Sequence, residues 1–410
     1  MATRTAIWLI FTGVLVVGIL AFFALRALGH RDRPPLGPDL EEAVLRAAVR
    51  DDGTTWPMFG GGQGLLGRAP TQLPDTLSVL WRFKTGGEVK SSAAIVEGRA
   101  FIGSSDRHVY ALGLHTGDKL WSFETGDAVE SSPLWIDGVV FVGSSDGFLY
   151  ALEAETGHLK WKYETRGDVL SAPNWTRSPD GRDVWILVGS YDNRLHCVDA
   201  ESGQAVWTYE TDNYVNGSPA VADGKAVFGG CDAIIHAVSL ADGTRVAGID
   251  SGSYIAGSAA FLDGQVYVGN YSNDFMRADV DRGQIVWKHT ESKAPLFSSP
   301  AITEDMVIFG SRDDFVYALR RDDGQRLWTF QTLGEVDSSP VVCGDKVIVG
   351  SGDGRLYMLR LADGKEVWSY ELGRPIASSP AVAQGAVVIG CDDGVVYAFG
   401  GRAPAAEIEP

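Results

Sequence analysis

The sequence predicts an all-β fold, an eight-bladed β-propeller of four-stranded antiparallel blades, preceded by one N-terminal transmembrane helix. Three observations predict the propeller. Trp recurs about every 40 residues, Gly recurs at fixed distances from each Trp, and turn signals divide each interval into four short strands. Hydrophobic residues make up 45% of the 410 residues, and the 50 Gly favour a turn-rich β protein.

The amino-terminal segment predicts a membrane anchor. After a short flank at residues 1–5, residues 6–25 are uncharged and long enough to span a bilayer. A cleaved signal peptide is the alternative, but its apolar region is shorter, and Arg26 stands where the cleavage site would lie. The three Arg after the segment favour a cytoplasmic domain, although long domains cross regardless of such charges. We expect single-pass anchoring in the cytoplasmic membrane with the propeller in the periplasm.

Residues 26–55 are expected to form a Pro-rich linker with a short amphipathic helix that begins at Asp39. The propeller is expected at 56–401 and a flexible tail at 402–410. The last unit lacks a Trp strand, whereas the first Trp strand precedes any complete unit. Residues 78–85 are therefore predicted to supply the outer strand of the last blade, which would close the ring.

The repeat itself is defined by its spacing. Successive Trp lie 40, 40, 46, 80, 41 and 40 residues apart, and Ala247 stands at the missing position. These residues are interpreted as structural anchors between blades: Trp81, Trp121, Trp161, Trp207, Trp287, Trp328 and Trp368. A Gly lies four residues before each Trp from the second onward, and another lies seven residues before a Tyr, His or Met in every unit.

Units of the form ALxxxTGxxxW followed by SSPxxxDGxVxVGSxDGxLYAL resemble the pyrroloquinoline-quinone (PQQ) repeat. The segment Trp56-Pro57-Met58-Phe59-Gly60 is similar to the entry motif of such propellers. The resemblance covers residues 56–400. It implies the fold of the quinoprotein dehydrogenases and of the BamB-type propeller of outer-membrane assembly, and it leaves both functions open.

A catalytic site must break the symmetry of the repeat, and most polar candidates do not. We letter the four expected strands of each unit A to D in chain order. A pair of Ser before strand A and an Asp in the turn between strands B and C recur in nearly every unit. His196 and His236 replace the Tyr that recurs in strand C. No catalytic residue and no metal ligand is therefore predicted. The net charge of −18 also argues against nucleic acid as a partner.

The resemblance to quinoprotein dehydrogenases implies PQQ held by an adjacent-Cys disulfide, with calcium, in an enzyme that oxidises an alcohol or a sugar. This sequence has four Cys and no adjacent pair. Polar residues before strand A could serve a cofactor only under that alternative: Lys90, Glu130, Asn216 and Asp337. The favoured expectation is a non-catalytic, cofactor-free scaffold for protein partners, similar to the BamB type in envelope assembly. BamB-type proteins are lipoproteins, whereas this chain is expected to carry a helix anchor.

The predicted partner surface is an arc of aromatic and amide residues in the loops and turns of blades three to six. It comprises Tyr191, Tyr214, Tyr254, Tyr271 and Phe297, with Asn213, Asn216 and Asn273 among them. Aromatic side chains bordered by amides are typical anchors of protein interfaces. The alternative is that these rings pack between the loops as local core.

Overall fold

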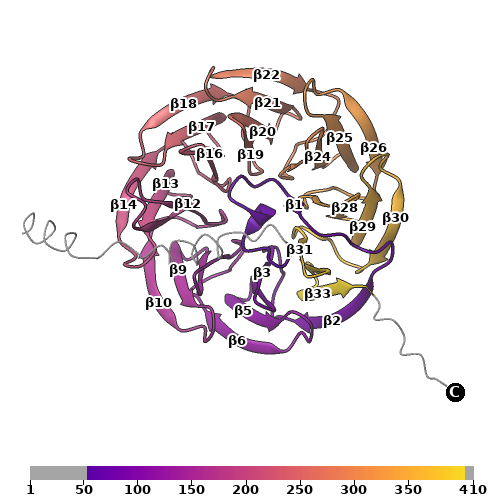
Figure 1. The fold of residues 1–410 in the computed structure, drawn as a ribbon, viewed down its shortest axis with the longest axis horizontal. Helices are drawn as coiled ribbons and strands as arrows, with labels where there is room; N and C mark the ends of the chain where they lie inside the picture. The colour runs from indigo at the N-terminus through magenta and orange to yellow at the C-terminus, as the bar shows by residue number, and fades with distance from the viewer. Residues whose placement is uncertain (1–52, 402–410) are drawn as a thin grey trace, which may run out of the picture. The chain divides into compact units, whose positions relative to one another are not determined.

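A computed structural model describes residues 53–401, which form a closed ring of eight antiparallel sheets (Figure 1). The predicted all-β, eight-bladed fold is confirmed. Within the described residues no helix is long and apolar enough to cross a membrane. The predicted anchor at 6–25, the amphipathic helix and the tail at 402–410 lie outside them.

Each blade runs from an inner strand A to an outer strand D, and its neighbouring strands pair antiparallel. Blades one and two are β3–β6 (Ala94–Val96, Arg99–Gly103, His108–Gly113, Lys119–Glu124) and β7–β10 (Leu134–Ile136, Val139–Gly143, Phe148–Glu153, Leu159–Glu164). Blades three and four are β11–β14 (Asn174–Arg177, Val184–Ser190, Arg194–Asp199, Ala205–Glu210) and β15–β18 (Ala220–Ala222, Lys225–Gly229, Ile234–Ser239, Arg245–Asp250).

Blades five and six are β19–β22 (Ala260–Leu262, Gln265–Gly269, Phe275–Asp279, Gln284–His289) and β23–β26 (Ala301–Ile302, Met306–Ser311, Phe315–Arg320, Arg326–Gln331). Blade seven is β27–β30 (Val341–Cys343, Lys346–Gly350, Arg355–Arg360, Glu366–Glu371). Its strand A also pairs in parallel with the two-residue β1 (Arg68–Ala69). Blade eight combines β31 (Ala381–Ala383), β32 (Ala386–Gly390) and β33 (Val395–Gly400) with β2 (Ser78–Lys84).

Blade two shows why these residues form strands. The central residues of β8 and β9 are buried on both faces, whereas β10 alternates between exposed and half-buried side chains, as an outer strand should. Asp137 and Gly138 join strands A and B with φ of 48° and 75°. Two successive positive φ values are typical of a type I′ hairpin turn, which Asp-Gly favours.

The ring is closed by β2, which precedes all complete blades in sequence but lies outside β33 in space (Figure 1). The pairing is antiparallel and places Trp81 opposite Ala398 and Arg82 opposite Tyr397. The last blade thus receives its fourth strand from the segment that precedes blade one in the sequence. This arrangement covers an edge that would otherwise expose unpaired backbone groups.

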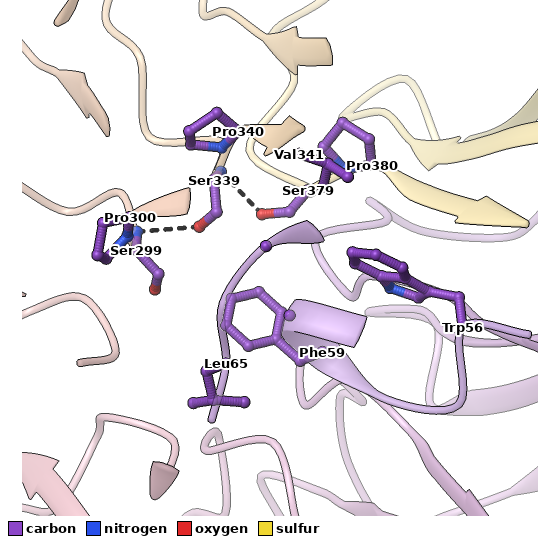
Figure 2. Close-up of a pocket in the computed structure, with 12 residues that line it drawn as sticks. Trp56, Phe59, Leu65, Ser299, Pro300, Ser339, Pro340, Val341, Ser379 and Pro380 are labelled. Atoms are coloured by element: carbon purple, nitrogen blue, oxygen red, sulfur yellow. Dashed lines mark hydrogen bonds between the residues drawn. The ribbon is translucent and has the colours of Figure 1, made fainter. Parts of the chain in front are cut away.

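Residues 53–69, which we call the axial plug, cross the axis on the side of the A–B turns and reach every blade (Figure 1). Their main chain or the Gln63 side chain bonds to the inner end of each blade, at Ile95, Trp135, Trp175, Val221, Phe261, Ile302, Val342 and Gln384. A cavity of about 10 Å³ lies between the plug and the inner strands of blades six to eight (Figure 2). The plug therefore fills the axis from one side.

The recurring Ser pairs join neighbouring blades. Ser298 Oγ donates to Ser338 O at 3.1 Å. Ser299 N donates to Ser339 Oγ at 3.0 Å, and Ser339 N donates to Ser379 Oγ at 2.9 Å (Figure 2). The Gly at or next to the end of each strand B is equally structural. A Cβ on Gly103 would lie 2.4 Å from the Val129 side chain of the next blade, so only Gly fits.

Candidate functional site

The D–A loops and B–C turns emerge together on the face opposite the axial plug, which we call the turn face. A repeated hydrogen bond joins them. The backbone N–H of the second residue of each B–C turn donates to a backbone carbonyl in the D–A loop that leads into the same blade. Examples are Ser105 N to Glu88 O at 2.9 Å and Tyr271 N to Tyr254 O at 2.8 Å. Side chains at these positions from all eight blades therefore form one rim around the axis.

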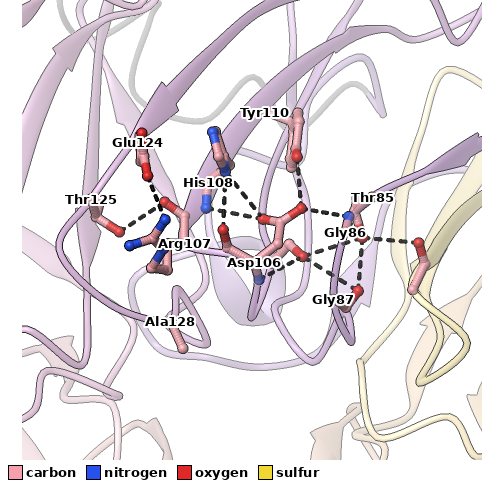
Figure 3. Close-up of polar contacts among 12 residues, drawn as sticks. Thr85, Gly86, Gly87, Asp106, Arg107, His108, Tyr110, Glu124, Thr125 and Ala128 are labelled. Carbon is pink, nitrogen blue, oxygen red and sulfur yellow. Dashed lines mark hydrogen bonds and ion pairs between the residues drawn. The ribbon is translucent and has the colours of Figure 1, made fainter.

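The Asp of the B–C turns serve this framework (Figure 3). The Asp106 carboxylate accepts hydrogen bonds from Tyr110 Oη at 2.7 Å, Gly86 N at 2.6 Å and His108 N at 3.1 Å. Burial opposes ionisation, but these hydrogen bonds outweigh it and hold the pKa of Asp106 below its ordinary value. The same Asp–Tyr contact recurs in the pairs Asp146–Tyr150, Asp313–Tyr317, Asp353–Tyr357 and Asp393–Tyr397.

The two His that replace this Tyr keep the same contact. His196 Nε2 lies 3.1 Å from the Asp192 carboxylate, and His236 Nε2 lies 2.8 Å from that of Asp232. The Nδ1 atoms contact the hydroxyls of Tyr163 and Tyr209, both at 3.1 Å. Both nitrogens of each imidazole thus have hydrogen-bond partners within the protein. These contacts explain the two His as structural residues of the blades.

The predicted arc lies on the turn face, where three of its rings are exposed and its other residues are half-buried. The side chains of Tyr214, Tyr254 and Tyr271 are 46%, 55% and 50% exposed. Tyr214 stacks in parallel on half-buried Tyr191 with ring centroids 4.7 Å apart, and Tyr271 meets half-buried Phe297 edge-on at 5.9 Å. The three exposed rings are not local core, because about half of each faces solvent.

The amides of the arc have mainly local partners. Asn213 Nδ2 donates to Cys231 O at 3.2 Å, and Asn216 Nδ2 donates to Ala256 O in the next loop at 3.2 Å. Asn273 has φ of 72°, a conformation that Asn tolerates better than most residues. Turn geometry accounts for the choice of Asn at these positions, and the exposed chemistry of the arc is mainly aromatic.

Glycines around the arc were not recognised from the sequence as part of the site. Gly217 and Gly257 replace the first Ser of the Ser pair, and Gly230 replaces the Ser that begins most B–C turns. A Cβ on Gly230 would lie 2.6 Å from Tyr214 O, and one on Gly257 would lie 2.6 Å from Phe297 O. The backbone segments therefore approach each other too closely at these two positions for a side chain to fit. The break in the Ser pattern was the available signal.

Charged residues occupy the rest of the rim. Lys90 pairs with Glu130 at 3.0 Å and with Glu88 at 3.3 Å. Arg312, which sequence reasoning missed, donates two hydrogen bonds to Asp337 at 2.8 and 2.7 Å. Its guanidinium also lies 3.6 Å from the Phe297 ring centroid, which links the charged sector to the arc.

Asp392 is a further rim residue that the sequence analysis did not single out. Burial and the nearby carboxylate of Glu88 raise its pKa above the ordinary value, against the opposing effect of Lys90. Its Oδ1 is buried and has no hydrogen-bond partner among the described residues. The rim therefore has an aromatic sector in blades three to six and a net acidic sector in the others.

The residues considered for a quinone and calcium do not fit that group. Lys90 and Glu130 pair with each other, Asp337 pairs with Arg312, and Asn216 donates to a neighbouring carbonyl. All four Cys are free thiols, so the disulfide that the dehydrogenase resemblance implies has no counterpart. Between residues 53 and 401, no group of three or more His, Cys, Asp or Glu is placed to hold a metal ion.

Comparison with known proteins gives one family. The model described as outer membrane protein assembly factor BamB matches residues 74–184, 170–246 and 231–408. The chain belongs to this family. No curated protein matches it.

Among solved structures, BamB from Moraxella catarrhalis is 23% identical, with a TM-score of 0.66 over 80% of this chain and 100% of that one. A europium-containing methanol dehydrogenase is 13% identical, with a TM-score of 0.71 over 88% and 100%. The quinohemoprotein alcohol dehydrogenase from Comamonas testosteroni is 14% identical, with a TM-score of 0.72 over 90% and 84%. At these identities the likeness shows the fold alone, for scaffold and enzyme alike.

Proposed function

We propose that this protein is a non-catalytic propeller that binds a protein partner through the aromatic arc of its turn face. It would act at the cell envelope in a role similar to BamB in outer-membrane protein assembly, anchored in the cytoplasmic membrane by residues 6–25. The observation that carries the proposal is the exposure of Tyr214, Tyr254 and Tyr271, at 46%, 55% and 50% of their surface. Family membership supports a general role in protein interaction.

The arc has the properties of a binding surface. Tyr supplies a large contact area with few rotatable bonds, and it is enriched among the residues that dominate interface energies. Stacking on Tyr191 restricts Tyr214 before any partner arrives, which lowers the entropy lost on binding. Exposed aromatic side chains that gather on one face mark interaction sites more often than isolated ones do.

The charge of the rim indicates what the partner presents. Six carboxylates border the axis, from Glu88, Glu130, Asp168, Glu335, Asp337 and Asp392, against the two cations of Lys90 and Arg312. The whole chain is also acidic, with a net charge of −18. We therefore propose a partner segment that combines basic residues with apolar or aromatic ones, because its charges complement the rim.

The decisive experiment is quantitative partner recovery from solubilised membranes, by crosslinking and mass spectrometry, for the native chain and a Tyr214→Ser, Tyr254→Ser variant. The variant should lose partner about tenfold or more, which corresponds to about 1.4 kcal/mol, with its melting temperature unchanged within a few degrees. Leu120→Ser, at an outer-rim side chain that is 50% exposed, is the matched control. Undiminished recovery with the double variant would show that the arc is not the interface.

Dehydrogenase activity is the second candidate, because two structural neighbours are a methanol dehydrogenase and a quinohemoprotein alcohol dehydrogenase. It predicts saturable binding of PQQ with calcium, dye-linked oxidation of an alcohol or sugar, and recovery of a c-type cytochrome. The scaffold proposal predicts outer-membrane assembly factors instead, and neither binding nor oxidation. Micromolar PQQ affinity that is lost on Asn216→Ala or Asp337→Ala would overturn the scaffold proposal.

The proposed location has its own test. In spheroplasts, added protease should digest a propeller that lies in the periplasm. Resistance that disappears only after lysis would place the propeller in the cytoplasm.

A further inference from the structure

In blades three and four the aromatic arc contains a stacked pair of Tyr rings. The rings of Tyr191 and Tyr214 are nearly parallel, with an interplanar angle of 2° and centroids 4.7 Å apart. Tyr214 is 46% exposed and contacts no second ring among the described residues. Neither phenol hydroxyl has a hydrogen-bond partner in that part of the chain. Nearly half of the Tyr214 surface, and both hydroxyls, are therefore unused within the protein.

An unpaired carboxylate lies beside this pair. The backbone carbonyl of Asp168 accepts a hydrogen bond from Tyr191 N at 2.9 Å. Asp168 is exposed, and its carboxylate forms no ion pair or hydrogen bond with the described residues, whereas Glu130 pairs with Lys90. Burial raises the pKa of Tyr191 most, and negative charges that include those of Asp168 and Glu130 raise it further. The ring pair therefore lies in a negative field.

The same rim already holds a guanidinium with an aromatic ring and a carboxylate. The guanidinium carbon of Arg312 lies 3.6 Å from the centroid of the Phe297 ring. Arg312 also donates two hydrogen bonds to Asp337, at 2.8 and 2.7 Å. This combination is favourable because the face of a planar cation stacks on the ring while its N–H groups point to oxygen.

Asp168 and the two Tyr offer the same kinds of group without a cation. No Lys or Arg of the described chain contacts the Asp168 carboxylate or lies over either ring. A metal ion would not suit them, because a hard cation takes several oxygen ligands and only one carboxylate is present. The groups instead suit one organic cation with a flat face.

We propose that Tyr191, Tyr214 and Asp168 bind the guanidinium of an Arg side chain in the partner polypeptide, and we call these three residues the Arg site. The guanidinium stacks against the Tyr pair and donates to the Asp168 carboxylate, with the phenol oxygens as further acceptors. Arg fits better than Lys because guanidinium is planar and more weakly hydrated. The Arg site rests on the proposed function, since it names one residue that the partner presents to the arc.

The test uses the full chain in detergent and the N-acetyl methylamides of arginine, citrulline and lysine. Citrulline has the shape of arginine without its charge, and lysine has the charge without the planar group. In NMR spectra with labelled Tyr rings, the arginine compound should shift the Tyr191 and Tyr214 signals saturably, with a Kd of about 10 mM. The Kd should rise with ionic strength. The lysine compound should bind about threefold more weakly, and the citrulline compound should not saturate in this range.

Two variants locate the binding, and a third is the matched control. Asp168→Asn keeps the shape of the side chain, removes its charge, and should raise the Kd of the arginine compound about threefold. Tyr214→Leu should raise it by a similar factor, with the melting temperature unchanged within a few degrees because the ring is exposed. Asp118→Asn removes another exposed carboxylate without a partner among the described residues, in a C–D turn, and should leave the Kd unchanged.

Three results would overturn the proposal: no saturable binding of the arginine compound, equal binding of the citrulline compound, or an unchanged Kd in Asp168→Asn. Partner recovery separates the Arg site from the proposed function. Asp168→Asn should lower recovery from solubilised membranes about threefold. Full recovery with this variant, together with loss in the Tyr214→Ser, Tyr254→Ser variant, would leave the aromatic interface in place and remove only the Arg site.

Discussion

Replacing Trp328 by Ala tests how much of the propeller's stability comes from the recurring Trp that pack between blades. Trp328 is 8% exposed, lies under Gly364, and donates to Leu361 O at 2.8 Å. Truncating a buried Trp costs about 3–5 kcal/mol, including the cavity that remains. The loss of the hydrogen bond contributes about 1 kcal/mol within that range, because Leu361 O is left without its donor. We expect a loss of about 4 kcal/mol.

The assay is equilibrium unfolding in denaturant, with the midpoint compared at equal slope between variant and native chain. Leu327→Ala is the control, since Leu327 precedes Trp328 in β26 but is 39% exposed. It should cost less than about 1 kcal/mol. A Trp328→Ala loss as small as that of the control would refute the reasoning and suggest a surface role for the repeated Trp.

Three further outcomes follow from the structure. Deleting residues 78–84 should lower the melting temperature sharply by uncovering β33, whereas deleting 402–410 should not, and equal effects would contradict the closure. Trp56→Phe should cost under about 1 kcal/mol of stability, because the buried Nε1 of Trp56 has no hydrogen-bond partner among the described residues, whereas Trp56→Ala should cost about 3–5 kcal/mol. Similar losses for the two variants in denaturant unfolding would contradict this. Burial lowers the pKa of His289, so its contribution to stability is full above about pH 6.5 and is lost as the pH falls toward its folded-state pKa. His289→Phe introduces the residue that blade six has at the matching position, Phe330. This variant should lose less melting temperature than the native chain between pH 7 and 5. An equal loss in both would exclude His289 as the cause of the pH dependence.

The fold was predictable because every blade repeats the same physical requirements. Gly103 must admit the Val129 side chain, and Gly364 must admit the Trp328 ring, so the spacing of Gly and Trp reports the architecture directly. The phase of the repeat placed 78–85 at the outside of the last blade, where β2 lies. An eightfold repetition leaves little ambiguity in topology.

The axial plug was not predictable beyond its entry motif. Its contacts use mostly main-chain groups, as in the bonds from Val221 N to Gln63 O and from Phe261 N to Gly64 O. Such bonds leave no pattern of side-chain types in the sequence. The position of Arg312 was hidden for a different reason, because its pairing with Asp337 and its contact with Phe297 join three separate segments that only the folded ring brings together.

The connection between blades four and five departs from the repeat at several positions that lie close together. Ala247, Tyr254 and Gly257 lie within eleven residues of one another, in β18 and the loop that follows it. The Tyr254 ring is 55% exposed and adds little packing energy to the fold, so the proposed interface accounts for this residue better than the core does.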